Sequence, residues 1–198
     1  MGKKIAGVPI SIKPEYYIIL ALSFLIIPIQ WIAAWIVASI FHEGCHYIAL
    51  RLSGCRIFRI QVSLNGMVMD TDLSDKSREI LCALAGPLGG LLLIIIGRWF
   101  PRVALCGIFQ SVYNLIPIYP LDGGRAVSGI LRKLFSEATA KGIQMWLENG
   151  VLLVFLIFGL YSALHLKLGL IPLIFAFILI MKNKRGKCTC KERPLGVK

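Results

Sequence analysis

Charged residues are scarce in this 198-residue sequence. They make up 16% of the chain, whereas hydrophobic residues make up 57%, and the mean hydropathy is +0.76. This apolar fraction exceeds that of ordinary soluble domains and indicates a polytopic membrane protein. The length allows several membrane spans with short loops, but it leaves no room for a second sizeable soluble domain.

Acidic residues are especially few, with 10 Asp and Glu against 22 Lys and Arg, which gives a net charge of +12. Basic residues gather near the N-terminus and again within residues 182–193. This placement follows the positive-inside rule and predicts that both termini lie in the cytoplasm. Topology and contact with anionic lipid explain the excess charge better than DNA binding, so no nucleic-acid partner is expected.

The sequence also lacks a small-residue cleavage site after its first apolar run, so no cleavable signal peptide is expected. Its six cysteines are scattered. Cys45, Cys82 and Cys106 lie in apolar segments, where they most simply act as small packing residues. Cys188 and Cys190 form a C-x-C pair, for which a reduced, unstructured tail is favoured over a metal site or thiol switch.

Six apolar segments predict an α-helical polytopic membrane protein with about six transmembrane helices. They run from Tyr16 to about Pro28, Trp31 to Leu50, Lys76 to Gly97, Val103 to about Ile118, Met145 to about Leu164, and Leu168 to Met181. An intramembrane domain is therefore expected over residues 1–181, followed by a basic cytoplasmic tail over residues 182–198.

A different pattern separates the second and third segments. Ile60, Val62 and Leu64 alternate with polar residues and precede the pair Asn65-Gly66. Alternation beside an N-G pair predicts a small membrane-associated β-hairpin, with an amphipathic connector on the membrane surface as the alternative.

The second apolar segment contains the run His42-Glu43-Gly44-Cys45-His46. Residues four apart share one helix face, so His42 and His46 can hold one metal ion between them. Glu43 lies beside them, where a general base is needed. Because ionisable groups are costly inside a bilayer, three of them together indicate a functional site.

A second constellation interrupts the fourth apolar segment. Two prolines and two glycines within residues 117–124 break the helix, and irregular backbone at membrane depth is tolerated only inside protein or beside a cavity. Asp122 lies in this break, at a depth like that of His46. Considered without the zinc motif, the run Asp122-Gly123-Gly124 would be interpreted as a turn with a helix cap. Catalytic zinc takes three protein ligands plus water, and Asp122 would complete the set with His42 and His46.

These motifs resemble those of the site-2 protease family of intramembrane zinc metalloproteases. The match lies in the zinc motif, in Ala85-Gly86-Pro87 and in residues 114–123. Within the family, the chain is similar to the bacterial branch that includes the stage IV sporulation protein FB. The pair Gly44-Cys45 departs from the commoner leucine-glycine, and neither a PDZ-like insertion nor a regulatory domain after the sixth segment is expected.

The resemblance implies one zinc ion per chain, bound by His42, His46 and Asp122. Glu43 would be the catalytic acid/base, and Asn114 would lie near the active site and orient the substrate. The implied activity is cleavage of peptide bonds in or near transmembrane segments, as in regulated intramembrane proteolysis. The implied partners are a membrane-protein substrate, the lipid bilayer and a membrane regulatory protein, in a multi-pass protein of a bacterial cell membrane.

Two other functions are compatible with the fold: a catalytically inactive membrane scaffold and a membrane metal transporter. The intact Glu43 and the single ligand cluster favour hydrolysis. An exposed strand edge in residues 57–69 is hypothesised to hold substrate by β-augmentation. For Glu148 and Asn149, at the start of the fifth segment, packing at the membrane interface is expected, with pairing to basic loop residues or a position facing the cleft as the alternatives.

Overall fold

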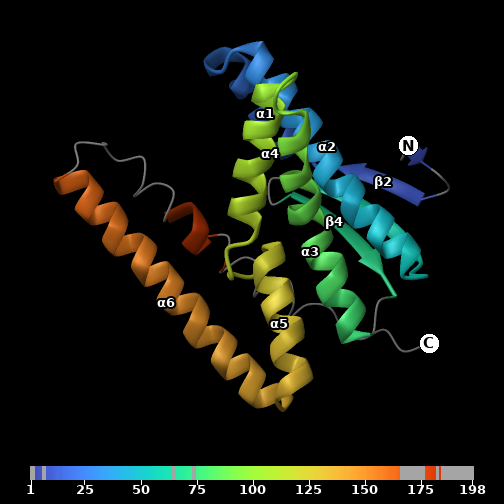
Figure 1. The fold of residues 1–198 in the computed structure, drawn as a ribbon, viewed down its shortest axis with the longest axis vertical. Coiled ribbons are helices and arrows are strands. Elements are labelled where there is room, and N and C mark those ends of the chain that lie inside the picture. Colours follow the sequence, from blue (N-terminus) through green and yellow to red (C-terminus); the bar gives the residue numbers. More distant parts are fainter. Residues whose placement is uncertain are drawn as a thin grey trace. The chain divides into compact units, whose positions relative to one another are not determined.

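The structure is a computed structural model that describes residues 3–5, 8–63, 66–72, 75–165, 177–181 and 183. The chain folds as two compact units, Met1–Leu115 and Ile116–Lys198. They are called the first and the second unit below. Figure 1 traces the elements in chain order.

The first unit is built around four helices. They are α1 (Pro14–Ile26), α2 (Ile29–Leu52), α3 (Lys76–Leu92), which continues into the 3-10 helix η1 (Leu93–Ile96), and α4 (Pro101–Asn114). The ends of these helices follow from the sequence. Asp75 accepts a hydrogen bond from the backbone N–H of Ser77 and caps α3, and Pro101 begins α4 at a position where no N–H is needed. Helices α2, α3 and α4 pack against one another (Figure 1).

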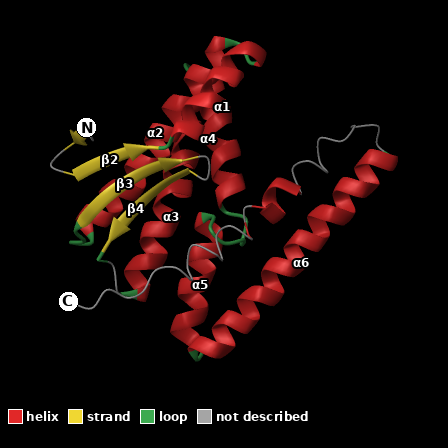
Figure 2. Ribbon diagram, turned by 180° about the vertical axis from the view of Figure 1, so that it is seen from behind, coloured by secondary structure: helices red, strands yellow, loops and turns green. Residues whose placement is uncertain are grey.

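The first unit also contains a four-stranded sheet (Figure 2). Its strands, in spatial order, are β1 (Lys3–Ile5), β2 (Val8–Ile12), β3 (Ile57–Ser63) and β4 (Gly66–Thr71). Strands β3 and β4 pair antiparallel, which confirms the predicted hairpin. Gly66 lies in β4 opposite Ser63, so it is not part of the connecting turn.

The exposed strand edge hypothesised within residues 57–69 is not on β3. Strand β2 pairs with β3 in parallel, with Ile10 opposite Ile60, so both edges of β3 are occupied. Strands β1 and β2 were not predicted from the sequence. Pro9 interrupts a short run, which weakens a strand signal, and the pairing joins residues about fifty positions apart in the sequence.

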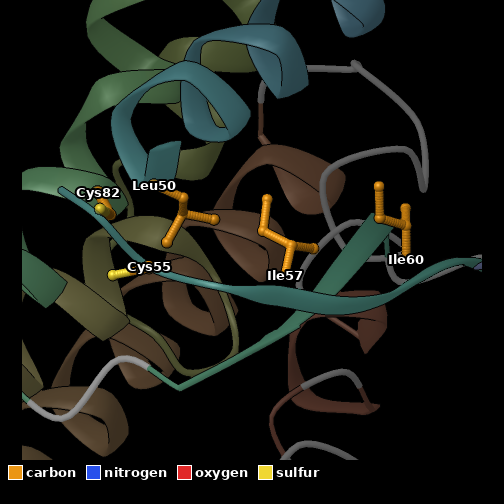
Figure 3. Close-up of a cluster of buried hydrophobic side chains, with 5 residues drawn as sticks. All are labelled: Leu50, Cys55, Ile57, Ile60 and Cys82. Carbon is orange, nitrogen blue, oxygen red and sulfur yellow. The ribbon is translucent and has the colours of Figure 1, made fainter. Parts of the chain in front are cut away.

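Two clusters of buried side chains hold the first unit together. One, shown in Figure 3, joins the end of α2 to the sheet and α3. It contains Leu50, Cys55, Ile57, Ile60 and Cys82. Burial raises the pKa of the Cys55 thiol, which keeps it protonated.

The other cluster brings Ala34 and Ala38 of α2 against Leu93 and Cys106, and its small residues allow close helix packing. Cys82 and Cys106 are thus the packing residues that the sequence predicted. Cys188 and Cys190 lie outside the described residues.

The second unit contains α5 (Asp122–Leu134) and α6 (Glu137–Leu164), which contact each other. Helix α5 is not one of the predicted apolar segments, and the fourth segment ends at Asn114 rather than near Ile118. Helix α6 begins eight residues before Met145, where Ser136 caps its first turn. Of the sixth predicted segment, only Phe177–Met181 is described, and it is helical.

The surface is strongly apolar for a protein of this size. Large hydrophobic side chains on several helices are mostly exposed, among them Leu25, Ile26, Ile95 and Trp146, and so is Trp99 in the turn before α4. Two stretches, Lys76–Ile96 and Glu137–Leu164, are long and apolar enough to cross a membrane by length and composition. The structure therefore agrees with a helical membrane protein, while the count of six spans stays a prediction.

Candidate metal centre

The two histidines of the zinc motif lie on one face of α2, as their spacing predicted. Both are buried, with 3% of His42 and 8% of His46 exposed. Their Nε2 atoms are 3.3 Å apart. Two nitrogens bound to one zinc ion at about 2.0–2.1 Å with tetrahedral geometry lie about 3.3–3.4 Å apart. The spacing of the two imidazoles therefore fits a shared metal ion.

A backbone carbonyl orients His46. Its Nδ1 lies 2.7 Å from the carbonyl oxygen of Cys82 on α3. Because a carbonyl oxygen only accepts hydrogen bonds, Nδ1 carries the proton and donates it. The Nε2 atom of the neutral ring then presents its lone pair, which is the arrangement that metal-binding histidines require.

Two glycines of α3, Gly86 and Gly90, allow this helix to approach these rings. A Cβ added at Gly86 would collide with Nε2 of His46. A Cβ at Gly90 would collide with Oγ of Ser111 and lie 3.6 Å from Nδ1 of His42. These small residues bring the α3 backbone directly against the two histidines.

Asn114, the last residue of α4, reaches the same histidine pair. Its Nδ2 atom lies 3.4 Å from Nε2 of His42. The structure thus places Asn114 beside the candidate centre, while its part in orienting substrate stays a prediction. Glu43 follows His42 on the same helical turn and is half-buried. Its role as acid/base also stays a prediction.

Asp122 is the first residue of α5 in the second unit, and only 9% of it is exposed. The positive end of a helix dipole favours a carboxylate at this position. The Nη1 atom of Arg125, three residues later, lies 3.7 Å from its Oδ1. The charge of this buried carboxylate is therefore partly balanced within its own helix.

His42 and His46 of the first unit and Asp122 of the second unit are all buried, and each offers a side-chain atom that can bind a metal ion. Two imidazoles and a carboxylate are ligands that zinc accepts in catalytic sites. The carbonyl of Cys82 is the site feature that sequence reasoning missed. A backbone acceptor belongs to every residue, so no sequence signal distinguishes it.

Comparisons with known proteins point the same way. No family model matches the chain. A zinc metalloprotease of Methanocaldococcus jannaschii is 28% identical over 180 residues, which cover 80% of this chain and 53% of the relative. The chain thus spans about half the length of that relative.

Among solved structures, a site-2 protease from Methanocaldococcus jannaschii matches with a TM-score of 0.66 and 24% identity. The match covers 99% of this chain and 96% of that chain. The two comparisons confirm the resemblance drawn from the sequence motifs, while the closer likeness to the stage IV sporulation protein FB stays a prediction.

Proposed function

We propose that this chain, which has the fold of a site-2 protease, is an intramembrane zinc endopeptidase. The proposal rests above all on the buried imidazole pair of α2, whose Nε2 atoms lie 3.3 Å apart beside Glu43. The sequence likeness to a zinc metalloprotease supports the same activity. The substrates would be peptide bonds in or near transmembrane segments of other membrane proteins, as in regulated intramembrane proteolysis.

His42, His46 and Asp122 would hold the metal. When bound, zinc polarises the scissile carbonyl and lowers the pKa of its water toward about 7. The carbonyl of Cys82 keeps the His46 ring in the tautomer and orientation that this ligation needs. Arg125 balances part of the Asp122 charge.

Glu43 would take the proton from the attacking water and later deliver it to the leaving amine. The amide of Asn114, which lies beside His42, can donate a hydrogen bond to the substrate carbonyl as negative charge develops on the oxygen. A helical substrate hides its carbonyls in backbone hydrogen bonds, so it must unwind locally before these groups can act on it.

An inactive scaffold or a metal transporter is less consistent with these residues. The zinc motif retains Glu43, a group that metal binding alone does not require. The described residues contain one set of His, Cys, Asp and Glu side chains that could hold a metal, whereas a conduction path needs several sites. Metal flux in liposomes without any proteolysis would favour transport.

The proposed location is a bacterial cell membrane, which the chain crosses several times with both termini in the cytoplasm. The basic residues at both ends support this orientation. A topology reporter fused after Lys198 should therefore report the cytoplasmic side. A reporter inserted within residues 98–102 should report the opposite side. If both reporters respond on one side of the membrane, the span count is wrong.

The sheet lies close to the proposed site and suggests where substrate could bind. Cys82, whose carbonyl orients His46, packs in the same cluster as Ile57 and Ile60 of β3. Among the described strands, β1 and β4 are the outer ones, and β4 is the one that pairs with β3. We infer that an unwound substrate adds to the outer edge of β4, which overlaps residues 57–69, where the sequence predicted an exposed strand edge.

Proline substitutions at Met67, Val68 and Met69 test this edge. Successive N–H groups of a strand point to alternate sides, so at least one of the three donates outward rather than to β3. At least one folded variant that retains zinc should cleave substrate roughly tenfold more slowly, as expected for about 1.4 kcal/mol of lost pairing. Alanine at the same positions should have much less effect.

The matched control for these variants is Gln61→Pro. Strand β3 pairs on both sides, so this change should destabilise the whole sheet instead of slowing cleavage selectively. Cleavage at the wild-type rate in every folded β4 proline variant would mean that substrate is held elsewhere.

A further inference from the structure

Glu148, for which packing at the membrane interface was expected, is buried within the protein. It lies in α6 with 1% of its surface exposed, whereas its neighbour Asn149 is exposed. A carboxyl group buried among apolar helices is costly unless hydrogen bonds compensate for the lost water. The hydrogen-bond partners of the Glu148 carboxylate therefore indicate the role of this residue.

Hydrogen bonds connect Glu148 to the loop before Asp122. The carboxylate oxygen Oε1 of Glu148 accepts hydrogen bonds from the backbone N–H of Tyr119, at 3.2 Å, and from Nε2 of Gln144, at 3.0 Å. Asn183 is also buried. With its amide nitrogen turned toward Glu148, it donates to Oε2 and to the carbonyl oxygen of Tyr119, each at 3.2 Å.

Both polar atoms of Tyr119's backbone are thus held by side chains from distant parts of the second unit. Tyr119 lies in the irregular segment between α4 and α5, where no regular helix supplies hydrogen-bond partners. Backbone groups at membrane depth must be satisfied within the protein. Glu148 and Asn183 meet this need at one residue.

Helix α5 also lies directly against this segment. A Cβ added at Gly124 would collide with the backbone of Ile118 and Tyr119, so the segment lies directly on the first helical turn. The N–H of Leu121 donates to the carbonyl of Ile118, at 2.9 Å. Glu148 and Gly124 therefore both lie against the peptide that joins Ile118 to Tyr119.

Asp122 follows Tyr119 by three residues and opens α5. A shift of the Tyr119 backbone must therefore move the start of the helix from which the Asp122 carboxylate projects. We propose that Glu148 is a positioning residue for Asp122, acting through the hydrogen bond to Tyr119. The inference rests on the proposed role of Asp122 as a zinc ligand.

The test compares Glu148→Leu with Glu148→Gln in the full-length protein, using zinc dissociation and hydrogen exchange of residues 116–121. Outer partners of metal ligands typically contribute about 10- to 100-fold to metal affinity. Glu148→Leu should lose zinc faster by a factor in this range and should lose amide protection in the loop. Glu148→Gln keeps an oxygen that accepts from Tyr119, so it should stay within about threefold of the wild type, well short of that range.

Two further variants distinguish a positioning role of Glu148 from general destabilisation of the protein. Ser162→Ala changes another fully buried residue of α6, about 21 Å along the helix from Glu148, and should leave both readouts unchanged. Gly124→Ala displaces the Tyr119 backbone by a contact that does not involve Glu148 and should reproduce the zinc and exchange changes. Because both variants act on one peptide, the double variant Glu148→Leu with Gly124→Ala should show less than the product of the single effects.

The proposal is overturned if Glu148→Leu retains wild-type zinc dissociation or wild-type loop protection, or if Ser162→Ala causes an equal loss. If Glu148→Leu does not fold, wild-type zinc dissociation in Gly124→Ala overturns it as well. Asp122→Ala, measured in parallel, distinguishes a failure of the positioning role of Glu148 from a failure of the assignment of Asp122 as a zinc ligand. Full zinc retention there would refute the ligand assignment, whereas the exchange data report on the loop independently of the metal.

Discussion

Glu43→Gln should abolish peptide-bond hydrolysis while leaving the fold and the bound zinc in place. The amide has nearly the same shape as the carboxylate but cannot accept the proton of the attacking water. Acid–base groups typically contribute about 10²- to 10⁴-fold to rate, so a loss at or beyond the upper end is expected when one residue serves both proton transfers. The measurement is cleavage of a membrane-embedded substrate by purified variants with equal zinc content.

The matched control is Glu137→Gln, at the start of α6. Glu137 pairs with Lys141 at 2.9 Å, but both side chains are more than 70% exposed, and exposed ion pairs contribute little. This variant should cleave at the wild-type rate. Appreciable cleavage by Glu43→Gln at matched zinc content would remove Glu43 from the role of general base.

Replacement of any one of His42, His46 and Asp122 by alanine should sharply reduce bound zinc and eliminate activity with it. Each change removes a direct ligand, so the loss of zinc affinity should exceed the roughly 10- to 100-fold typical of outer partners. Elemental analysis of the purified variants after dialysis measures the loss. Asp122→Ala with full zinc and full activity would exclude Asp122 from the centre.

Two glycine variants check whether the zinc site depends on close packing of α3 against α2. Gly86→Ala would place a methyl group against Nε2 of His46 and should lower zinc content although every ligand is present. Gly44 lies between the two histidines with nothing within 4 Å of an added Cβ, so Gly44→Ala should bind zinc normally. Equal zinc content in the two variants would contradict the packing seen between these helices.

The part of the site that could be predicted from the sequence depends on local geometry. His42 and His46 are four residues apart on one helix, and helical periodicity alone places their rings together. The turn before α5 was indicated by its prolines and glycines. The alternation of Ile60 and Val62 with polar residues correctly predicted the hairpin strands.

The features that escaped prediction arise from contacts between distant segments. The parallel pairing of β2 with β3, which removes the free edge of β3, joins residues near the N-terminus to residues 60–62. The carbonyl of Cys82 belongs to the backbone and has no side-chain signature. Glu148 stands out in the sequence as a charge within an apolar helix, but its partner is a backbone N–H of Tyr119, which no spacing rule reveals.

The most direct test of the central claim compares membrane-protein fragments in cells that express the wild type or Glu43→Gln. The two proteins should be present at equal levels and carry equal zinc. If the chain is an intramembrane zinc endopeptidase, wild-type cells should contain at least one fragment with a new terminus in or near a transmembrane segment, and that fragment should be absent with Glu43→Gln. Identical fragment sets from the two zinc-loaded proteins would contradict the proposed function.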